Sequence, residues 1–291
     1  MTTPSEPELP QYGFGRVLAV WAAAAVPMAL LGWVASPVLA GGIDARAGIP
    51  GTARVSLMTA GLAWQFVLSL LLVRGEAGRL DWPTLRARLR LGSPRHPRTL
   101  ARDRRLWLWL IPFAVLFMAE MFVVSPPLHK AWVAAFPFLA EPAEFRFAAL
   151  LESPKNRALL VGAWWFYGLF LLLAVFNTVL GEELLFRGLL LPRMRGRFGR
   201  WDWLGNGVLF GLYHLHQPWG IPGGLIAGSL FFALPATLFR STWMAIAIHF
   251  NLAGNTFFYS NCGCGSTFSS PFTWAPARLR SSAEMRATEA T

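Results

Sequence analysis

Cysteine is scarce in this chain of 291 residues, which carries only two, Cys262 and Cys264 in the stretch NCGCG. A disulfide between residues two apart in the sequence would be strained, so we predict no disulfide framework. Neither a CxxC pair nor a second cysteine cluster is present, which argues against a structural zinc site. We interpret the two thiols as part of a glycine-rich loop, with a contribution to metal binding as the alternative.

Charged residues are sparse as well, at 14% of the chain against 55% hydrophobic residues, and the mean hydropathy is +0.44. Ordinary soluble domains contain about 25% charged residues, so this composition excludes that class. A helix needs about 20 apolar residues to span the hydrocarbon core of a membrane. The sequence therefore predicts an all-α fold, a polytopic membrane helical bundle with about seven to eight transmembrane helices.

Seven windows along the chain have the length and apolar character of such helices. They cover residues 17–39, 55–73, 106–124, about 159 to 191, 203–215, 225–239 and 242–259. A basic loop at 74–105, interrupted by three prolines, separates the first two windows from the rest. We therefore expect an N-terminal accessory pair with its loop at 1–105, a membrane core at 106–260 and a C-terminal tail at 261–291.

Acidic residues are fewer than basic ones, 15 against 26, which gives a net charge of +11. Ten arginines lie between residues 74 and 105, and five more lie between 187 and 200. Loops rich in Lys and Arg stay on the cytoplasmic side, so we predict a multi-pass protein of the inner (cytoplasmic) membrane with a cytoplasmic N-terminus. No nucleic-acid module accompanies the arginines, and anionic lipid headgroups rather than nucleic acid are the expected partners.

The stretch GEELLFRGLLL, residues 181–191, places three charged side chains inside the fourth window. Ionisable side chains are costly at membrane depth and are therefore functional candidates. Glu183 and Arg187 are four residues apart, with the acid first, which favours an ion pair on a helix. Glu182 is rotated by about 100° from Glu183 and is left free for chemistry. A purely structural pair at a helix end, with Glu182 reaching the interface, is the alternative.

Imidazole and amide side chains occur in the later windows. His214 lies in LFGLYHLHQP, and His249, Asn251 and Asn255 lie in AIAIHFNLAGN. At about 1.5 Å per residue, Glu182, His214 and His249 lie roughly 16, 16 and 14 Å from the cytoplasmic ends of their windows. This shared depth predicts that three helices bring the side chains to one site. Polar cross-links between helices, without any chemistry, are the alternative.

Water activation is the chemistry that these residue types support best. A buried carboxylate can take a proton from water and return it, and an imidazole can share that work. A second imidazole and an amide can donate hydrogen bonds to the oxyanion that forms when water attacks a carbonyl group. The chain has neither the GxSxG elbow of a serine nucleophile nor an HExxH zinc motif. The residues therefore predict hydrolysis by an activated water molecule.

The motifs EExxxR at residues 182–187 and FxxxH at residues 210–214, followed by His249, resemble those of the CPBP intramembrane protease family. This family includes the type II CAAX prenyl endopeptidases and the bacteriocin-immunity (Abi) homologues. The resemblance covers about residues 159–258. It implies that the core at 106–260 is a CPBP-like intramembrane protease, which hydrolyses peptide bonds within an all-helical membrane fold.

The resemblance also implies a role for each matching residue. Glu182 would be the base that activates water, assisted by His214, while Glu183 and Arg187 would support the site. His249 would help to stabilise the oxyanion together with an asparagine. The implied substrate is a membrane-presented peptide or protein, and a prenylated C-terminus is one form that the family suggests.

The sequence departs from the family at its last motif. The asparagine that commonly follows the last histidine by four residues is replaced here by Ala253. Asn251 and Asn255 lie two positions to either side, and we expect one of them to take over the role. The alternatives are a weaker oxyanion site or lost catalysis. The last of these predicts a non-catalytic membrane scaffold or bacteriocin-immunity factor that retains the protease fold.

The need for a metal is open at this level, because the family is described both as metalloproteases and as metal-independent glutamate proteases. The cofactor is therefore either none or a divalent metal such as zinc. If a metal is present, Glu182, His214 and His249 would supply the three protein ligands of a catalytic site. His216 is expected at the interface, with metal ligation as the alternative. A proton-coupled transporter would predict an internal repeat, and none is visible.

Overall fold

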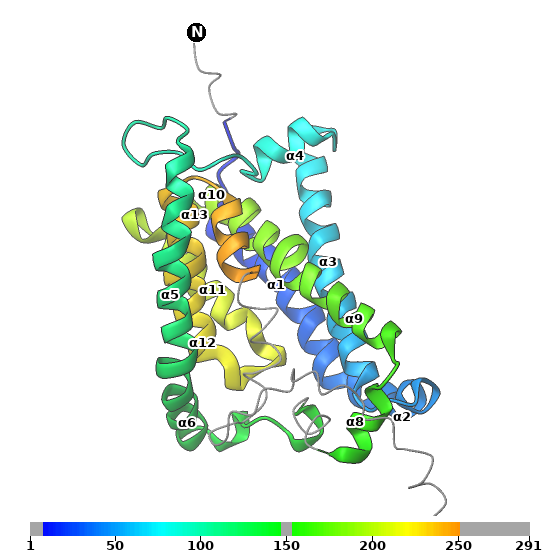
Figure 1. Cartoon of the computed structure of the whole chain (residues 1–291). Coiled ribbons are helices and arrows are strands. Elements are labelled where there is room, and N and C mark those ends of the chain that lie inside the picture. The colour runs from blue at the N-terminus through cyan, green and yellow to red at the C-terminus, as the bar shows by residue number, and fades with distance from the viewer. Residues whose placement is uncertain (1–7, 147–152, 251–291) are drawn as a thin grey trace, which may run out of the picture.

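The computed structural model describes residues 8–146 and 153–250 (Figure 1). All regular structure within these ranges is helical, apart from an isolated bridge between Arg95 and Arg102. The α-helices are α1 (Phe14–Leu30), α2 (Ser36–Ala47), α3 (Thr52–Ala77), α4 (Trp82–Arg88), α5 (Leu110–Ala119), α6 (Ser125–Ala135), α8 (Pro154–Leu160), α9 (Trp164–Val175), α10 (Leu191–Arg193), α11 (Asp202–Tyr213), α12 (Ile221–Ile226) and α13 (Leu234–Leu238). The all-α prediction is confirmed.

Other helical forms connect or widen these elements. Tight 3-10 turns occur at Arg104–Trp109, Pro137–Leu139, Ala143–Phe145, Gly199–Trp201, His214–His216 and Pro218–Gly220. Wider π-helical segments occur at Leu31–Ala35, Glu120–Val124, Phe176–Gly181, Leu184–Leu190 and Ala227–Ala233. π-Helical turns inside longer helices are frequent at functional sites. Two of them flank Glu182 and Glu183 directly.

Five continuous helices are long and apolar enough to cross a membrane. They are Phe14–Ala47, Thr52–Ala77, Arg104–Ala135, Trp164–Arg193 and Pro218–Leu238. These helices are called the first to fifth spans below. They correspond to the first four predicted windows and to the sixth, so the predicted membrane helical bundle is confirmed, with five such spans among the described residues.

The other two windows, and one boundary, differ from the expectation. The fifth window became α11, which has only 12 residues because the 3-10 turn His214–His216 follows it. The seventh window is helical at residues 242–250, and its remainder lies outside the described residues. The fourth span begins at Trp164, later than predicted, because Gly162 has a φ of 79° and separates it from α8.

The two ends of the bundle are distinct in Figure 1. The segment 8–13, called the N-terminal segment below, lies with α4 and α10 at one end, and α2, α6 and α8 lie at the other. The α3 and α9 helices run along one side, the third span with α5 and α6 runs along the opposite side, and α11 and α12 lie between them (Figure 1). The arginine-rich region between 74 and 105 and the end of the fourth span therefore share one end.

The first two spans pack directly against the part of the chain that carries the motifs. Side chains of the first two spans and of the fourth share one continuous buried apolar cluster. The indole of Trp21 donates to the carbonyl oxygen of Leu209 at 2.7 Å, and that of Trp33 donates to Leu215 at 2.7 Å. The division at residue 105 stays a prediction, but the two N-terminal spans hold α11 and the turn after it in place.

The third span is packed differently from the other four. Only 11% of its most apolar window is buried, against 33% or more in the other spans. Its exposed large apolar side chains are Leu108, Trp109, Ile111, Val115, Leu116, Phe122, Val123 and Val124. Apolar surface of this size in a membrane bundle faces lipid tails, so the third span forms an outer wall of the molecule.

Close contact between α11 and the fifth span depends on a glycine. A methyl group on Gly207 would overlap the backbone and the hydroxyl of Ser229, and backbone atoms cannot move aside as a flexible side chain can. We expect Gly207→Ala to destabilise the fold by about 1 to 3 kcal/mol or more through overpacking. Thermal unfolding in detergent measures this loss. Gly168→Ala in α9 is the matched control, because no atom lies within 4 Å of a methyl group there. Equal unfolding temperatures for the two variants would contradict the prediction.

Candidate active site

The ion pair predicted inside the fourth span is present. Arg187 donates from Nη1 to Glu183 Oε1 at 3.1 Å, and both side chains are completely buried. The second guanidinium nitrogen of Arg187 donates to the carbonyl oxygen of Gly228 in the fifth span at 3.1 Å. The arginine therefore joins the fourth span to the fifth span as well as balancing the charge of Glu183.

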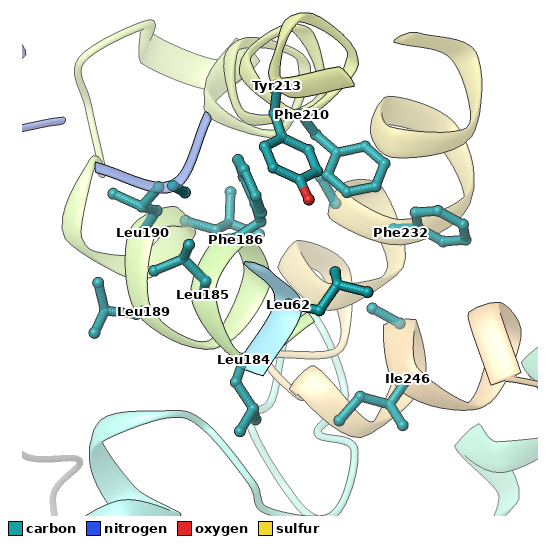
Figure 2. Packing of buried hydrophobic residues seen from close by; sticks show 14 of the residues in the cluster. Leu62, Leu184, Leu185, Phe186, Leu189, Leu190, Phe210, Tyr213, Phe232 and Ile246 are labelled. Carbon is teal, nitrogen blue, oxygen red and sulfur yellow. The ribbon is translucent and has the colours of Figure 1, made fainter. Parts of the chain in front are cut away.

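Aromatic rings enclose the Arg187 guanidinium. Its central carbon lies 4.0 Å from the ring centroid of Phe210 and 5.1 Å from that of Phe232, distances at which cations are attracted to ring faces. Figure 2 shows Phe210 and Tyr213 of α11 facing Phe186 of the fourth span, with Phe232 on the other side of Phe210. These rings keep the ion pair in a dry environment.

His249 binds the same carboxylate as Arg187. Its Nδ1 lies 2.9 Å from Glu183 Oε1, and its ring stacks on Phe232 with centroids 4.4 Å apart. We expected this ring to face Glu182, and its observed hydrogen bond runs to Glu183 instead. The reason is geometric, because adjacent helical residues point about 100° apart. Glu183 is directed toward Arg187 and His249, whereas Glu182 is directed toward the hydroxyl group of Tyr213.

Glu182 is buried, with 3% of its surface exposed, and it interacts with the hydroxyl group of Tyr213. That hydroxyl also accepts a hydrogen bond of 2.7 Å from Nε2 of Gln65 in α3. The phenol can therefore donate its hydrogen to Glu182 while it accepts from the amide. Neither partner was predicted from the sequence. The signals were present, since Gln65 is a polar residue within an apolar window and Tyr213 precedes His214.

The FxxxH spacing has a direct physical explanation. His214 Nδ1 lies 2.9 Å from the carbonyl oxygen of Phe210, one helical turn earlier, and the two rings pack edge to face at 4.9 Å. A carbonyl oxygen can only accept, so the hydrogen of the neutral imidazole lies on Nδ1. Nε2 is left with its lone pair. The motif thus produces an imidazole with a defined tautomer, in which Nε2 carries the lone pair.

His214 belongs to the same group of residues as Glu182. Its ring centroid is 5.0 Å from that of Tyr213, whose hydroxyl interacts with Glu182. His214 is also within electrostatic range of His249 and Arg187. The structure therefore brings the two glutamates, the arginine and the two histidines of the sequence prediction to one region, in which His214 is partly buried and the other four residues are buried. These five residues are called the buried group below.

His216 is placed differently from the interfacial position that we expected. Its side chain is buried, and its ring lies nearly parallel to that of His214 with centroids 5.6 Å apart. The first span causes this burial, because Gly32 leaves the space that the Cβ atom of His216 occupies. The carbonyl oxygen of His216 accepts a hydrogen bond of 3.3 Å from Arg54.

The geometry of the described residues bears on the alternative that Glu182, His214 and His249 bind a metal ion. Within the described ranges, no three His, Cys, Asp or Glu side chains are grouped so that they could hold a metal ion. Glu182, His214 and His249 therefore do not form a ready-made three-ligand site. Asn251, Asn255 and both cysteines lie outside the described residues.

A comparison with protein families adds an independent finding. Residues 163–253 match the family model described as type II CAAX prenyl endopeptidase Rce1-like. Residues 163–253 are thus Rce1-like in sequence. The match confirms the resemblance found in the sequence, and the Rce1-like segment carries all five residues of the buried group. No curated protein and no solved structure matches the chain. With the apolar spans, the Rce1-like match supports a membrane protein with a protease role of the CAAX type.

Proposed function

We propose that this chain is an intramembrane endopeptidase in which Glu182 and His214 activate water to hydrolyse a peptide bond. One observation carries the proposal, namely the different surroundings of the two adjacent carboxylates. Two basic side chains, Arg187 and His249, bind Glu183. Glu182 interacts with a neutral hydroxyl group, that of Tyr213, and the Tyr213 ring packs against His214, whose Nε2 carries a lone pair. Glu182 is thus the carboxylate available for proton transfer.

The proposed reaction needs only water and the peptide. Glu182 takes a proton from the water molecule as its oxygen bonds to the carbonyl carbon, with His214 Nε2 holding the water in line. The tetrahedral intermediate then breaks the carbon–nitrogen bond. The proton held by Glu182 passes to the leaving nitrogen, and the products are a carboxylic acid and an amine. Tyr213 positions Glu182 throughout, because its hydroxyl group is itself fixed by Gln65.

His249 is proposed to stabilise the oxyanion of that intermediate. Its Nδ1 faces Glu183, so a second donor at Nε2 is present only when the ring is an imidazolium. In that form the two carboxylates and the two cations, Arg187 and His249, balance to zero charge. Donors fixed in advance toward a developing negative charge are the strongest contributors to such catalysis. Asn251 or Asn255 would supply a further donor.

The proposed substrate is a membrane-presented peptide or protein, and a prenylated C-terminus is the first form to test because of the Rce1-like match. We propose an inner-membrane location with the N-terminus in the cytoplasm. The arginine-rich region and the N-terminal segment share one end of the bundle, which supports this orientation (Figure 1).

A second candidate function is supported by Ala253, which stands where the family commonly has asparagine. In this proposal the chain is a non-catalytic scaffold or immunity factor that retains the protease fold. It predicts that the cellular phenotype survives Glu182→Ala and His214→Ala. Loss of the phenotype in both variants would exclude it.

The full chain, reconstituted into vesicles, is expected to cleave a reporter peptide anchored in the same bilayer. We expect the rate to persist in excess chelator and the purified protein to contain metal well below one equivalent, because the described donors are not arranged for a metal. Mass spectrometry of the products and elemental analysis of the protein provide the measurements. Activity that is lost on chelation and restored by zinc would replace the glutamate mechanism with a metal-bound water. Absence of cleavage with prenylated and unprenylated reporters would favour the scaffold.

A further inference from the structure

A second polar centre lies at the end of the bundle that carries the N-terminal segment. The side chain of Glu76, at the end of α3, is 5% exposed and accepts hydrogen bonds from Arg193 at 2.9 and 3.1 Å from Nε and at 2.6 Å from Nη2. The hydroxyl of Tyr12 donates to the same carboxylate. Burial, followed by the bond to Glu76, raises the pKa of Tyr12 to about 12, so the phenol stays protonated at physiological pH. Arg193 and Tyr12 together satisfy Glu76.

Two further guanidinium groups lie beside this satisfied carboxylate. Arg16 is 4.0 Å and Arg88 is 3.8 Å from the Glu76 oxygens, which is beyond hydrogen-bonding distance. Arg16 also lies over the ring of Tyr12, 3.9 Å from its centroid, and this contact orients it. The side chains of Arg16 and Arg88 are 52% and 22% exposed, so both can donate to another group.

Arg16 and Arg88 line a cavity of about 650 Å³. The cavity is completed by Glu8, Leu9, Pro10, Gln11, Gly75 and Glu76. Three guanidinium groups therefore surround Glu76, and the other carboxylate at the cavity is Glu8. Arginine forks bind phosphate oxygens in pairs, which suits this cavity to a phosphate group.

The position of the cavity relative to the ends of the membrane spans identifies the source of that phosphate. The first span begins at Phe14, the second ends at Ala77 and the fourth ends at Arg193, so three spans reach the membrane surface around this cavity. Lipid phosphates occupy this level of a bilayer. We propose that Arg16 and Arg88 bind the phosphate of an anionic phospholipid in this cavity. The site is separate from the proposed catalytic centre and does not depend on it.

Retention of lipid by the purified full chain tests this proposal. Native mass spectrometry is used with phosphatidylglycerol and with phosphatidylcholine of the same acyl chains. We expect preferential retention of phosphatidylglycerol, weakened about fivefold by Arg16→Gln or Arg88→Gln and about 30-fold by both changes. Glu8→Gln should strengthen retention, because it removes a negative charge from the cavity wall.

The control variant is Arg79→Gln. Arg79 is 72% exposed and pairs with Asp81 at 3.2 Å, and it does not line the cavity. Equal weakening by Arg79→Gln would overturn the proposal in favour of general surface charge. Competition by inorganic phosphate at the same concentration as the lipid would overturn the lipid assignment. An arginine variant that unfolds at a lower temperature in lipid-free detergent is not used. Glu8→Gln, which removes no contact of Glu76, then provides the test: stronger retention of phosphatidylglycerol supports the proposal, and unchanged or weaker retention overturns it.

Discussion

Replacing Glu182 with glutamine is expected to reduce peptide cleavage by about a hundredfold to ten-thousandfold, the contribution that positioned acid–base groups make to catalysis. The amide has the shape of the carboxylate and can still meet the Tyr213 hydroxyl, but it cannot accept a proton from water. The fold should therefore survive. Initial rates on a bilayer-anchored reporter, measured with protein of unchanged unfolding temperature, give the comparison.

Glu120→Gln is the matched control for that loss. Glu120 is also a buried glutamate inside a span, and it accepts a hydrogen bond from Ser125, but it lies in the third span and outside the proposed centre. Its replacement should leave the cleavage rate close to that of the wild type. Full activity in Glu182→Gln, or an equal loss in both variants, would rule out Glu182 as the specific base.

Replacing Arg187 with leucine is expected to destabilise the fold by about 3 to 5 kcal/mol, the usual consequence of removing one partner from a buried ion pair. The change leaves the buried carboxylate of Glu183 with His249 but without its arginine partner, and it removes the hydrogen bond to Gly228 and the cation over Phe210. Unfolding monitored by heat or denaturant in detergent measures the loss.

The double variant Arg187→Leu with Glu183→Gln separates charge from packing. It should recover part of the lost stability, because the buried carboxylate that lost its arginine partner is gone, although the link to the fifth span stays broken. Arg79→Gln breaks an exposed pair and should leave the unfolding temperature unchanged, since such pairs contribute little. If the double variant were no more stable than Arg187→Leu, the charge of Glu183 would not be the source of the instability.

Local spacing in the sequence predicted the contacts that form within one helix. The i, i+4 relation of Glu183 and Arg187 and the FxxxH spacing both correspond to direct contacts one turn apart. The gathering of the buried group was also predicted, because equal depth depends only on the rise of a helix.

Contacts between helices could not be predicted in the same way. Periodicity within one helix does not state which neighbour each face meets, so the pairing of His249 with Glu183 and the bond of Gln65 to Tyr213 were missed. The burial of His216 was missed for the same reason, since it depends on Gly32 in a span nearly two hundred positions earlier. The length of α11 depended on a tight turn that the apolar pattern did not indicate.

The pairing of His249 with Glu183 has a consequence for biosynthesis. Glu182, Glu183 and Arg187 within the fourth span include one more acid than base, and His249, the histidine partner of Glu183, lies 66 residues later in the chain. A ribosome therefore delivers this span to the membrane before His249 exists, and before Tyr213 exists to link Glu182 with Gln65 of the second span. Arrival of the helix at 242–250 supplies the missing imidazole, so the centre is completed only after nearly the whole chain has been inserted.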